Sequence, residues 1–344
     1  MFEDFTNVWT PVAASEELER AAPLGLRLAD VPLALFRDAE GRPAAVLDRC
    51  PHRGVALSLG KVEEGRLQCP FHGWEFDREG ASCRIPWNPD ARRDRLGVTA
   101  FPAHELGGQV WVYTGHAPPG PPETADVFAS PHVRVSGFTM PIEAHWTRVM
   151  ENMLDWPHLP FVHRSTIGRA MVASSASGRM DIELEDRPYG FTTHIAIDGT
   201  KQTGRLDFRF PNMMVLSILD GSRTLTMQVA CVPESASRTR MVITMARSFL
   251  KLGLLDAIFH YQNRKIAMQD KAVIESSWPV EVPKAGEERS VRTDEPTLRF
   301  RKIYFDRLRG SSSSTTSAPI PAERLTRTAG AKRAMANESA SREG

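Results

Sequence analysis

The spacing of hydrophobic and polar positions differs between the two ends of the chain. From about residue 5 to residue 115, short apolar runs are separated by Gly, Asp and Pro, as at 33–36, 44–47 and 108–113. Apolar runs of this length, bounded by turn-forming residues, are typical of short strands joined by tight turns. We therefore predict that the N-terminal part is an all-β unit.

The remainder of the chain mixes helical and strand-like spacing. Residues 180–247 alternate in the manner of strands, most clearly at 213–219 and 224–230. Helical spacing is expected at three places: 137–165, until Pro157 and Pro160 disturb it, 249–276, and 294–309 with Asp294 as its cap. The pattern as a whole predicts the α+β class, with an antiparallel sheet flanked by helices after the β unit.

Two changes in composition suggest where the chain divides. A proline-rich break at 116–122 indicates a boundary, so we expect an N-terminal domain at 1–120 and a second domain at 121–309. From residue 310 onward small and polar residues predominate and little could be buried, which predicts a disordered tail at 310–344.

Bulk composition excludes several classes of protein. The 344 residues include 43 basic and 42 acidic ones, so no general attraction to nucleic acid or anionic lipid is implied. No apolar stretch approaches the ~20 residues that span a bilayer, and the N-terminus lacks the pattern of a secretory signal. Four cysteines are too few for a disulfide framework. We expect a cytoplasmic protein without a membrane span.

Two short motifs pair a cysteine with a histidine. Cys50 and His52 are separated by one residue, and Cys69 and His72 by two. Two thiolates with two imidazoles suit either tetrahedral zinc or a Rieske [2Fe–2S] centre, in which His replaces Cys on one iron. A glycine follows each motif closely and indicates a turn that presents the ligands from a loop. Cys83 and Cys231 are expected to be free thiols.

A second group of polar residues follows in the sequence. Asp155, His158 and His163 share the spacing D-x-x-H-x-x-x-x-H. They could be no more than polar residues at the end of a helix. The two imidazoles could instead be ligands of a metal.

Together these motifs resemble those of the Rieske non-haem iron oxygenases, in their large, terminal oxygenase subunits. The resemblance rests on CPHRG and CPFHGWEFD, on the Asp155 motif, and on Q-D-K-x-V-x-E at 269–275. It implies a catalytic domain of the helix-grip type. It also implies that Cys50 and Cys69 hold one iron of the cluster and that His52 and His72 hold the other. A mononuclear Fe(II) would be bound by His158, His163 and Asp270, with Glu275 and Asp256 as rival carboxylates.

The resemblance also assigns roles around these ligands. Asp155 would bridge His158 to His72 of a neighbouring subunit, which implies a homotrimer. Asn152 stands three residues before Asp155, a compact spacing similar to that of vanillate and dicamba demethylases and pheophorbide oxygenase. A role for Asn152 near the iron is therefore considered alongside the simpler one of a polar helix residue. This branch makes a monooxygenase the expectation.

The implied function is that of a terminal oxygenase using O2. Electrons would come from NAD(P)H through a reductase or ferredoxin, because the chain has no G-x-G-x-x-G fingerprint of its own. The substrate would be a small, largely apolar or aromatic molecule that is hydroxylated, demethylated, desaturated or cyclised. Candidates for the pocket wall are Phe161, Phe208, Phe210, Met213, Met214 and Leu216. The alternatives are a Rieske electron-transfer protein without oxygenase activity and a zinc-binding structural module.

Overall fold

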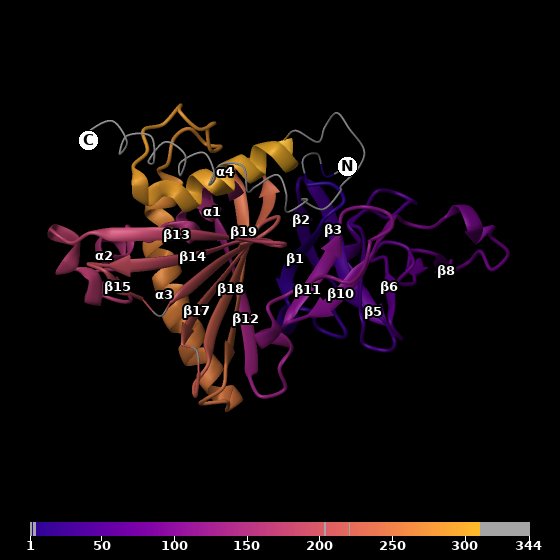
Figure 1. Cartoon of the computed structure of the whole chain (residues 1–344). Coiled ribbons are helices and arrows are strands. Elements are labelled where there is room, and N and C mark those ends of the chain that lie inside the picture. The colour runs from indigo at the N-terminus through magenta and orange to yellow at the C-terminus, as the bar shows by residue number, and fades with distance from the viewer. Residues whose placement is uncertain (1, 3–4, 203, 220, 310–344) are drawn as a thin grey trace, which may run out of the picture.

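The computed structural model describes residues 2, 5–202, 204–219 and 221–309, and the tail predicted at 310–344 lies outside this part of the chain. An N-terminal group of small sheets is followed by one large sheet with helices packed against it (Figure 1). This arrangement confirms the predicted α+β class and the all-β character of the N-terminal unit.

Three small antiparallel sheets build the N-terminal unit. The first has the order β1-β11-β10, with β1 (Trp9–Ala14), β10 (Ala103–Leu106) and β11 (Gln109–Tyr113). The second has the order β2-β3-β4-β9, with β2 (Leu24–Leu28), β3 (Val31–Arg37), β4 (Pro43–Leu47) and β9 (Ala100–Phe101). The third has the order β5-β6-β7-β8, with β5 (Lys61–Glu63), β6 (Arg66–Gln68), β7 (Glu75–Phe76) and β8 (Ser82–Arg84).

The large sheet has eight strands, all paired in antiparallel fashion. Its order is β12-β19-β18-β17-β16-β14-β13, and the short β15 also pairs with β14. The strands are β12 (Arg134–Ile142), β13 (Met180–Arg187), β14 (Gly190–Ile197), β15 (Thr200–Lys201), β16 (Arg205–Arg209), β17 (Met213–Leu219), β18 (Leu225–Ser235) and β19 (Arg238–Arg247). The predicted alternation over 180–247 therefore corresponds to seven consecutive strands.

Four α-helices accompany this sheet in the described residues: α1 (Trp146–Leu154), α2 (Leu159–Val162), α3 (Asp256–Glu275) and α4 (Glu295–Arg307). Helix α1 packs against β17, β18 and β19 and also contacts α3 and α4. Asp294 occupies the cap position of α4, but its carboxylate accepts the N–H of Val291 (2.7 Å) rather than one from the helix. No helix in the described part of the chain has both the length and the apolar character that crossing a membrane requires.

The prediction of helical structure over 137–165 is wrong for its first part. Residues 137–142 belong to β12, which pairs with β19 from Arg134↔Arg247 to Ile142↔Thr239. Helical structure begins only at Trp146. Pairing along a neighbouring strand satisfies every second backbone group of β12, and this tertiary pairing outweighs local helical spacing.

The first two small sheets share one hydrophobic core with the large sheet, and the third packs in a separate cluster with β3 and β4. Side chains of β1, β3 and β11 belong to the same buried cluster as those of β12, β18 and β19. Polar contacts reinforce the junction, because Arg240 pairs with Glu17 at 3.0 Å and the N–H of Ala29 donates to the carbonyl of Pro233 at 2.7 Å. The two halves are therefore packed firmly against each other.

Candidate metal centres

Two loops at the tip of the N-terminal unit carry the Cys/His motifs, and they have the same backbone geometry. In the first, the N–H of Gly54 donates to the carbonyl of Cys50 at 2.8 Å. In the second, Gly73 donates to Cys69 at 3.1 Å. Both glycines have φ near +70°, a conformation that residues with a Cβ rarely adopt. The glycine after each motif therefore lets the loop fold back and present its two ligands.

The four predicted cluster ligands lie together at this tip. Cys50 and Cys69 are buried, whereas His72 is exposed. The rings of His52 and His72 have centroids 4.7 Å apart, and the ring of His52 stacks on Trp74. The thiols thus form the inner side of the pair of loops and the imidazoles form its outer side.

The surroundings of these side chains fit an iron–sulfur cluster. Nδ1 of His52 is buried and has no hydrogen-bond partner. Burial, together with the neighbouring Cys69, raises the pKa of the Cys50 thiol to about 11, although the backbone N–H groups of His52 and Arg53 act in the opposite direction. A bound metal would take both sulfurs as thiolates, and N–H groups aimed at sulfur are a known influence on cluster potential.

A second group of ligands is assembled by α2 and α3. His158 precedes α2, His163 follows it, and Asp270 projects from α3. Their ligand atoms all lie within 4.8 Å of one another. Oδ1 of Asp270 is 3.1 Å from Nε2 of His163 and 3.6 Å from Nε2 of His158. Two imidazoles and one carboxylate on one side of a site match the facial arrangement of non-haem Fe(II) centres.

The polar atoms of His158, His163 and Asp270 favour a cation bound between them. Oδ1 of Asp270 is buried yet accepts no hydrogen bond, despite the nearby Nε2 atoms. Burial by itself lowers the pKa of His163, but Asp270 and Gln269 outweigh this effect and the pKa of His163 is raised. A divalent cation would give the carboxylate oxygen a partner and replace the proton that Asp270 favours on His163.

The rival carboxylates lie in other surroundings. Asp256 forms ion pairs with Arg134 and Arg247, which hold the pKa of Asp256 at about 2 although burial acts to raise it. Glu275 pairs with Lys271 and accepts the N–H of Glu143 at 2.8 Å. Of the three carboxylates, only that of Asp270 lies beside the two histidines.

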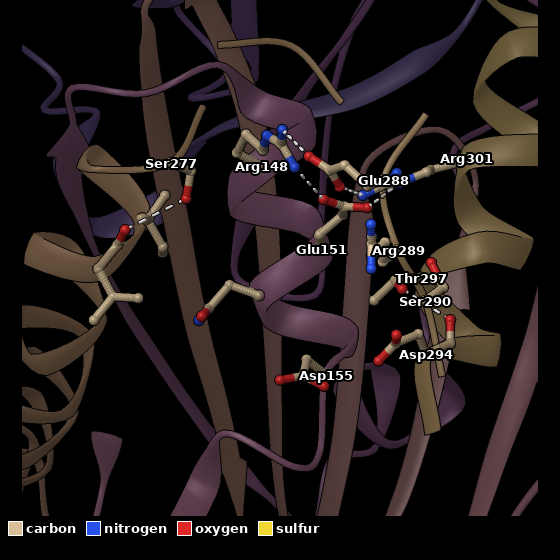
Figure 2. A pocket seen from close by; sticks show the side chains of 13 residues that line it. Arg148, Glu151, Asp155, Ser277, Glu288, Arg289, Ser290, Asp294, Thr297 and Arg301 are labelled. Carbon is tan, nitrogen blue, oxygen red and sulfur yellow. Dashed lines mark hydrogen bonds and ion pairs between the residues drawn. The ribbon is translucent and has the colours of Figure 1, made fainter. Parts of the chain in front are cut away.

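Asp155 and Asn152 lie on the other side of His158, along the end of α1. One oxygen of Asp155 is 3.2 Å from both the backbone N–H and Nδ1 of His158. The side-chain amide of Asn152 is buried and without a partner. Both residues line a polar cavity of about 270 Å³ between α1, α3 and the segment before α4 (Figure 2). In its wall Arg148 and Arg301 each bridge Glu151 and Glu288, which forms a closed ring of ion pairs.

Most of the residues suggested for a substrate wall belong to the core. Phe208, Met213 and Met214 are buried in the main hydrophobic cluster, and Phe210 and Leu216 pack against it. Phe161 instead lines an apolar cavity of about 200 Å³ together with Pro157, Pro160, Met171, Met180 and Ile197. Alternating apolar residues in a sheet face the core on one side, and sequence spacing does not distinguish core from pocket.

Sequence reasoning missed the contacts that orient the ligands. Gln269, the residue before Asp270, has its carboxamide oxygen 2.9 Å from Nδ1 of His163 and accepts the hydroxyl of Thr166 at 2.9 Å. The sequence shows that Gln269 is next to Asp270, but His163, the partner of the Gln269 side chain, lies 106 residues away. Only the approach of α3 to α2 brings the two together.

Two family models match separate parts of the chain. The family described as Rieske [2Fe-2S] domain matches residues 8–102, and the family described as vanillate O-demethylase oxygenase C-terminal domain matches residues 142–308. The first match includes all four Cys/His ligands of the tip. The second includes Asp155, His158, His163 and Asp270.

Curated relatives cover different parts of the chain. Chlorophyllide a oxygenase of Chlamydomonas reinhardtii is 32% identical over 266 residues, which is 72% of this chain but 39% of that protein. The oxygenase component of dicamba O-demethylase from Stenotrophomonas maltophilia is 37% identical over 162 residues, or 46% of this chain and 48% of that protein. The chain thus spans less than half the length of these relatives.

Solved structures show the same fold. A crystal structure of dicamba monooxygenase bound to dicamba matches with a TM-score of 0.77 at 23% identity, covering 90% of this chain and 99% of that one. NdmB of Pseudomonas putida CBB5 matches with a TM-score of 0.71 at 26% identity, covering 87% and 89% of the two chains. The two-part architecture and the course of the large sheet are therefore shared with these proteins.

Proposed function

Because this chain belongs to the Rieske oxygenases with a vanillate O-demethylase-type C-terminal domain, we propose that it is a terminal oxygenase. It uses O2 and electrons that originate from NAD(P)H to oxidise a small, largely apolar or aromatic molecule, with insertion of one oxygen atom as the expected outcome. The reaction on the substrate is a hydroxylation, a demethylation, a desaturation or a cyclisation.

One observation carries the proposal: two different sets of metal ligands occur in one chain. The tip loops offer two buried thiols and two adjacent imidazoles, which suit a cluster that transfers single electrons. His158, His163 and Asp270 offer three ligands on one side, which suit an Fe(II) that also binds O2. Neither an electron-transfer protein nor a zinc-binding structural module would need the second set.

We assign the residues of both sites accordingly. Cys50, Cys69, His52 and His72 bind the [2Fe–2S] cluster, and His158, His163 and Asp270 bind the iron. When bound, that iron supplies the centre at which O2 is reduced beside the substrate. Asp155 accepts a hydrogen bond from Nδ1–H of His158 and thereby directs Nε2 toward Asp270. Asn152, whose amide has no partner, is assigned to the same region.

The electron donor is proposed to be a separate reductase or ferredoxin. The chain has no G-x-G-x-x-G fingerprint with which to bind NAD(P)H itself, so the electrons must be delivered by a second protein.

We also propose a head-to-tail homotrimer in which Asp155 accepts a hydrogen bond from His72 of a neighbouring subunit. Figure 1 supports this proposal, because β5, β6 and β8 lie at the opposite end of the molecule from α2. Electrons leaving the tip loops would have a short route only to the iron of another subunit.

Two further assignments complete the proposal. The chain is divided near residue 120, in the segment between the end of β11 at Tyr113 and the start of β12 at Arg134. The protein acts in the cytoplasm, a reducing compartment in which cysteines stay out of disulfides, as all four do here.

Substrate screening with a surrogate reductase tests the function. The purified protein is supplied with NADH, the reductase and a panel of methoxylated, N-methylated and unsubstituted aromatic compounds. We expect NADH consumption above background with a product whose mass has risen by one oxygen or fallen by one methylene. An Asp270→Ala variant serves as the control and should form no product. NADH use without any product in the wild type would favour the electron-transfer alternative.

A further inference from the structure

We propose that Gln269 is a positioning residue that fixes the tautomer of His163 at the iron site. Its carboxamide oxygen holds the ring proton on Nδ1, and this leaves the lone pair of Nε2 free for a metal. The inference rests on the proposed function, because it deepens the account of the same site, but it makes a separate claim about one side chain.

In the structure the oxygen end of the Gln269 amide faces His163. Oε1 is 2.9 Å from Nδ1 of His163 and also accepts the hydroxyl of Thr166 at 2.9 Å. The amide nitrogen donates to the hydroxyl of Ser165 at 3.3 Å. An acceptor facing Nδ1 is matched by the tautomer of His163 that carries its proton on Nδ1.

This hydrogen bond matters because His163 has two possible partners. Its side chain is buried, with Oδ1 of Asp270 only 3.1 Å from Nε2. Without an acceptor at Nδ1, the proton of a neutral imidazole would reside on Nε2 and point at Asp270. A metal would then have to displace that proton from the very atom it needs, at a cost in affinity.

The two histidines also differ in the charge of their acceptors. Nδ1 of His158 faces the carboxylate of Asp155 at 3.2 Å, whereas Nδ1 of His163 faces a neutral amide. A carboxylate pulls more strongly on the ring proton and makes the imidazole a stronger donor to the metal than an amide does. Gln269 thus supplies orientation at His163 without adding another negative charge beside Asp270.

Three variants separate the acceptor role from simple packing. Gln269→Leu keeps the approximate size of the side chain but removes the acceptor, and Gln269→Glu keeps an acceptor oxygen. Gln262→Leu is the matched control, because Gln262 is exposed on the same helix, two turns earlier. The mononuclear site is stripped with a chelator while the cluster is retained, and Co²⁺ binding is then measured by equilibrium dialysis. Thermal unfolding of each variant is recorded in parallel.

We expect Gln269→Leu to bind Co²⁺ about 10- to 100-fold more weakly than the wild type, with Gln262→Leu unchanged. Gln269→Glu should restore binding to within a few-fold of the wild type, at unchanged unfolding temperature. Wild-type affinity in Gln269→Leu, or equal weakness in the Leu and Glu variants, would overturn the proposal. Neither result would contradict the proposed function, which fails if the wild type binds no metal at His158, His163 and Asp270 or forms no product.

Discussion

Single residues decide whether the tip loops can close. Gly54 and Gly73 both have φ near +70°, but their surroundings differ. A Cβ added at Gly54 would meet no atom within 4 Å, whereas one at Gly73 would lie 3.3 Å from Cγ of Pro86. The two positions therefore separate the cost of backbone strain from the cost of a close contact.

Replacing either glycine with alanine should weaken the N-terminal unit. We expect Gly54→Ala to lower the free energy of unfolding by about 1–2 kcal/mol, the usual cost of a left-handed conformation for a residue with a Cβ. Gly73→Ala should cost more, because Pro86 must also shift. Urea unfolding followed by the visible absorption of the cluster measures both. If the two variants lose the same free energy of unfolding, Pro86 moves aside without measurable cost and the expected difference is contradicted.

The third iron ligand can be tested by comparing two carboxylates on the same helix. Asp270→Ala should abolish iron at the mononuclear site while the cluster absorption stays intact, because two imidazoles alone hold Fe(II) poorly. Glu275→Ala, five residues further along α3, should retain that iron. Metal analysis of both variants gives the answer, and full iron content in Asp270→Ala would remove Asp270 from the ligand set.

Sequence spacing was informative where ligands are close neighbours in the chain. Cys50 with His52 and Cys69 with His72 share short loops, so their joint presentation follows from local geometry. Asp270 could be chosen only by resemblance, because the approach of α3 to α2 is a tertiary event. The role of Gln269 as a hydrogen-bond acceptor could not be predicted from the sequence for the same reason.

At the scale of elements, helix α1 links the iron site to the rest of the second domain. It begins after His145, whose Nδ1 accepts from Thr147, and its end carries Asn152 and Asp155. The ring formed by Arg148, Glu151, Glu288 and Arg301 joins its middle to α4 and to the segment before α4 (Figure 2). Displacement of α1 would therefore move Asp155 relative to His158.

The ring of ion pairs should be costly to break. Arg301→Met leaves the partly buried carboxylates of Glu151 and Glu288 with only the buried Arg148 as a counter-charge. We expect a loss of about 3–5 kcal/mol in the free energy of unfolding. Lys302→Met, on the same helix but with an exposed side chain, should change it by less than about 1 kcal/mol. Chemical unfolding of both variants provides the comparison, and a small loss in Arg301→Met would contradict the account.

His145 gives α1 a dependence on pH. Burial is the main reason that the pKa of His145 falls from 6.5 to about 4 in the folded protein. The unfolded chain then binds a proton that the folded one does not, between about pH 6.5 and pH 4. Above pH 6.5 the imidazole is neutral in both states and the free energy of unfolding is at its full value. As the pH falls from 6.5 to 4, the free energy of unfolding decreases by up to about 3 kcal/mol.

A His145→Asn variant keeps a helix cap but cannot titrate. We expect its free energy of unfolding to vary less between pH 6.5 and pH 4 than that of the wild type. Denaturant unfolding at several pH values within the window measures the difference. Parallel curves for the two proteins would show that His145 is not the titrating group.

The prediction of elements failed where pairing outweighed local spacing. Residues 137–142 have enough apolar positions to suggest a helix, yet β19 offers them a partner along their whole length. The strands between residues 180 and 247 were predictable because apolar runs are bounded by turns, although β18 and β19 are buried almost continuously rather than on alternate residues. Their order in the sheet depends on contacts that no local pattern contains.

At the scale of the whole molecule, the two ligand sets are held apart by a rigid junction. One hydrophobic cluster runs from the first two small sheets into the large sheet. Cys50 and Cys69 belong to a second cluster, which joins β3 and β4 to the third small sheet. The tip loops therefore cannot swing toward α2 without disrupting the core that they share with the second sheet. The tip and the iron site of one chain are therefore not expected to exchange electrons directly. This is the physical reason for proposing an assembly of several chains.

Mixed assemblies test transfer between subunits. A Cys50→Ser chain lacks a functional cluster and an Asp270→Ala chain lacks iron, so each should be inactive alone. Co-expressed under different affinity tags, the mixed assembly should regain part of the wild-type turnover, because an intact cluster then faces an intact iron site. Each variant purified alone is the control. An inactive mixed assembly with both partners present and folded would place electron transfer within one chain.

Metal and sulfide analysis of the purified protein tests the central claim most directly. The account predicts a red-brown protein with about three irons and about two acid-labile sulfides per chain, of which one iron is lost in Asp270→Ala. A colourless protein containing zinc, or one with two irons that Asp270→Ala leaves unchanged, would contradict it.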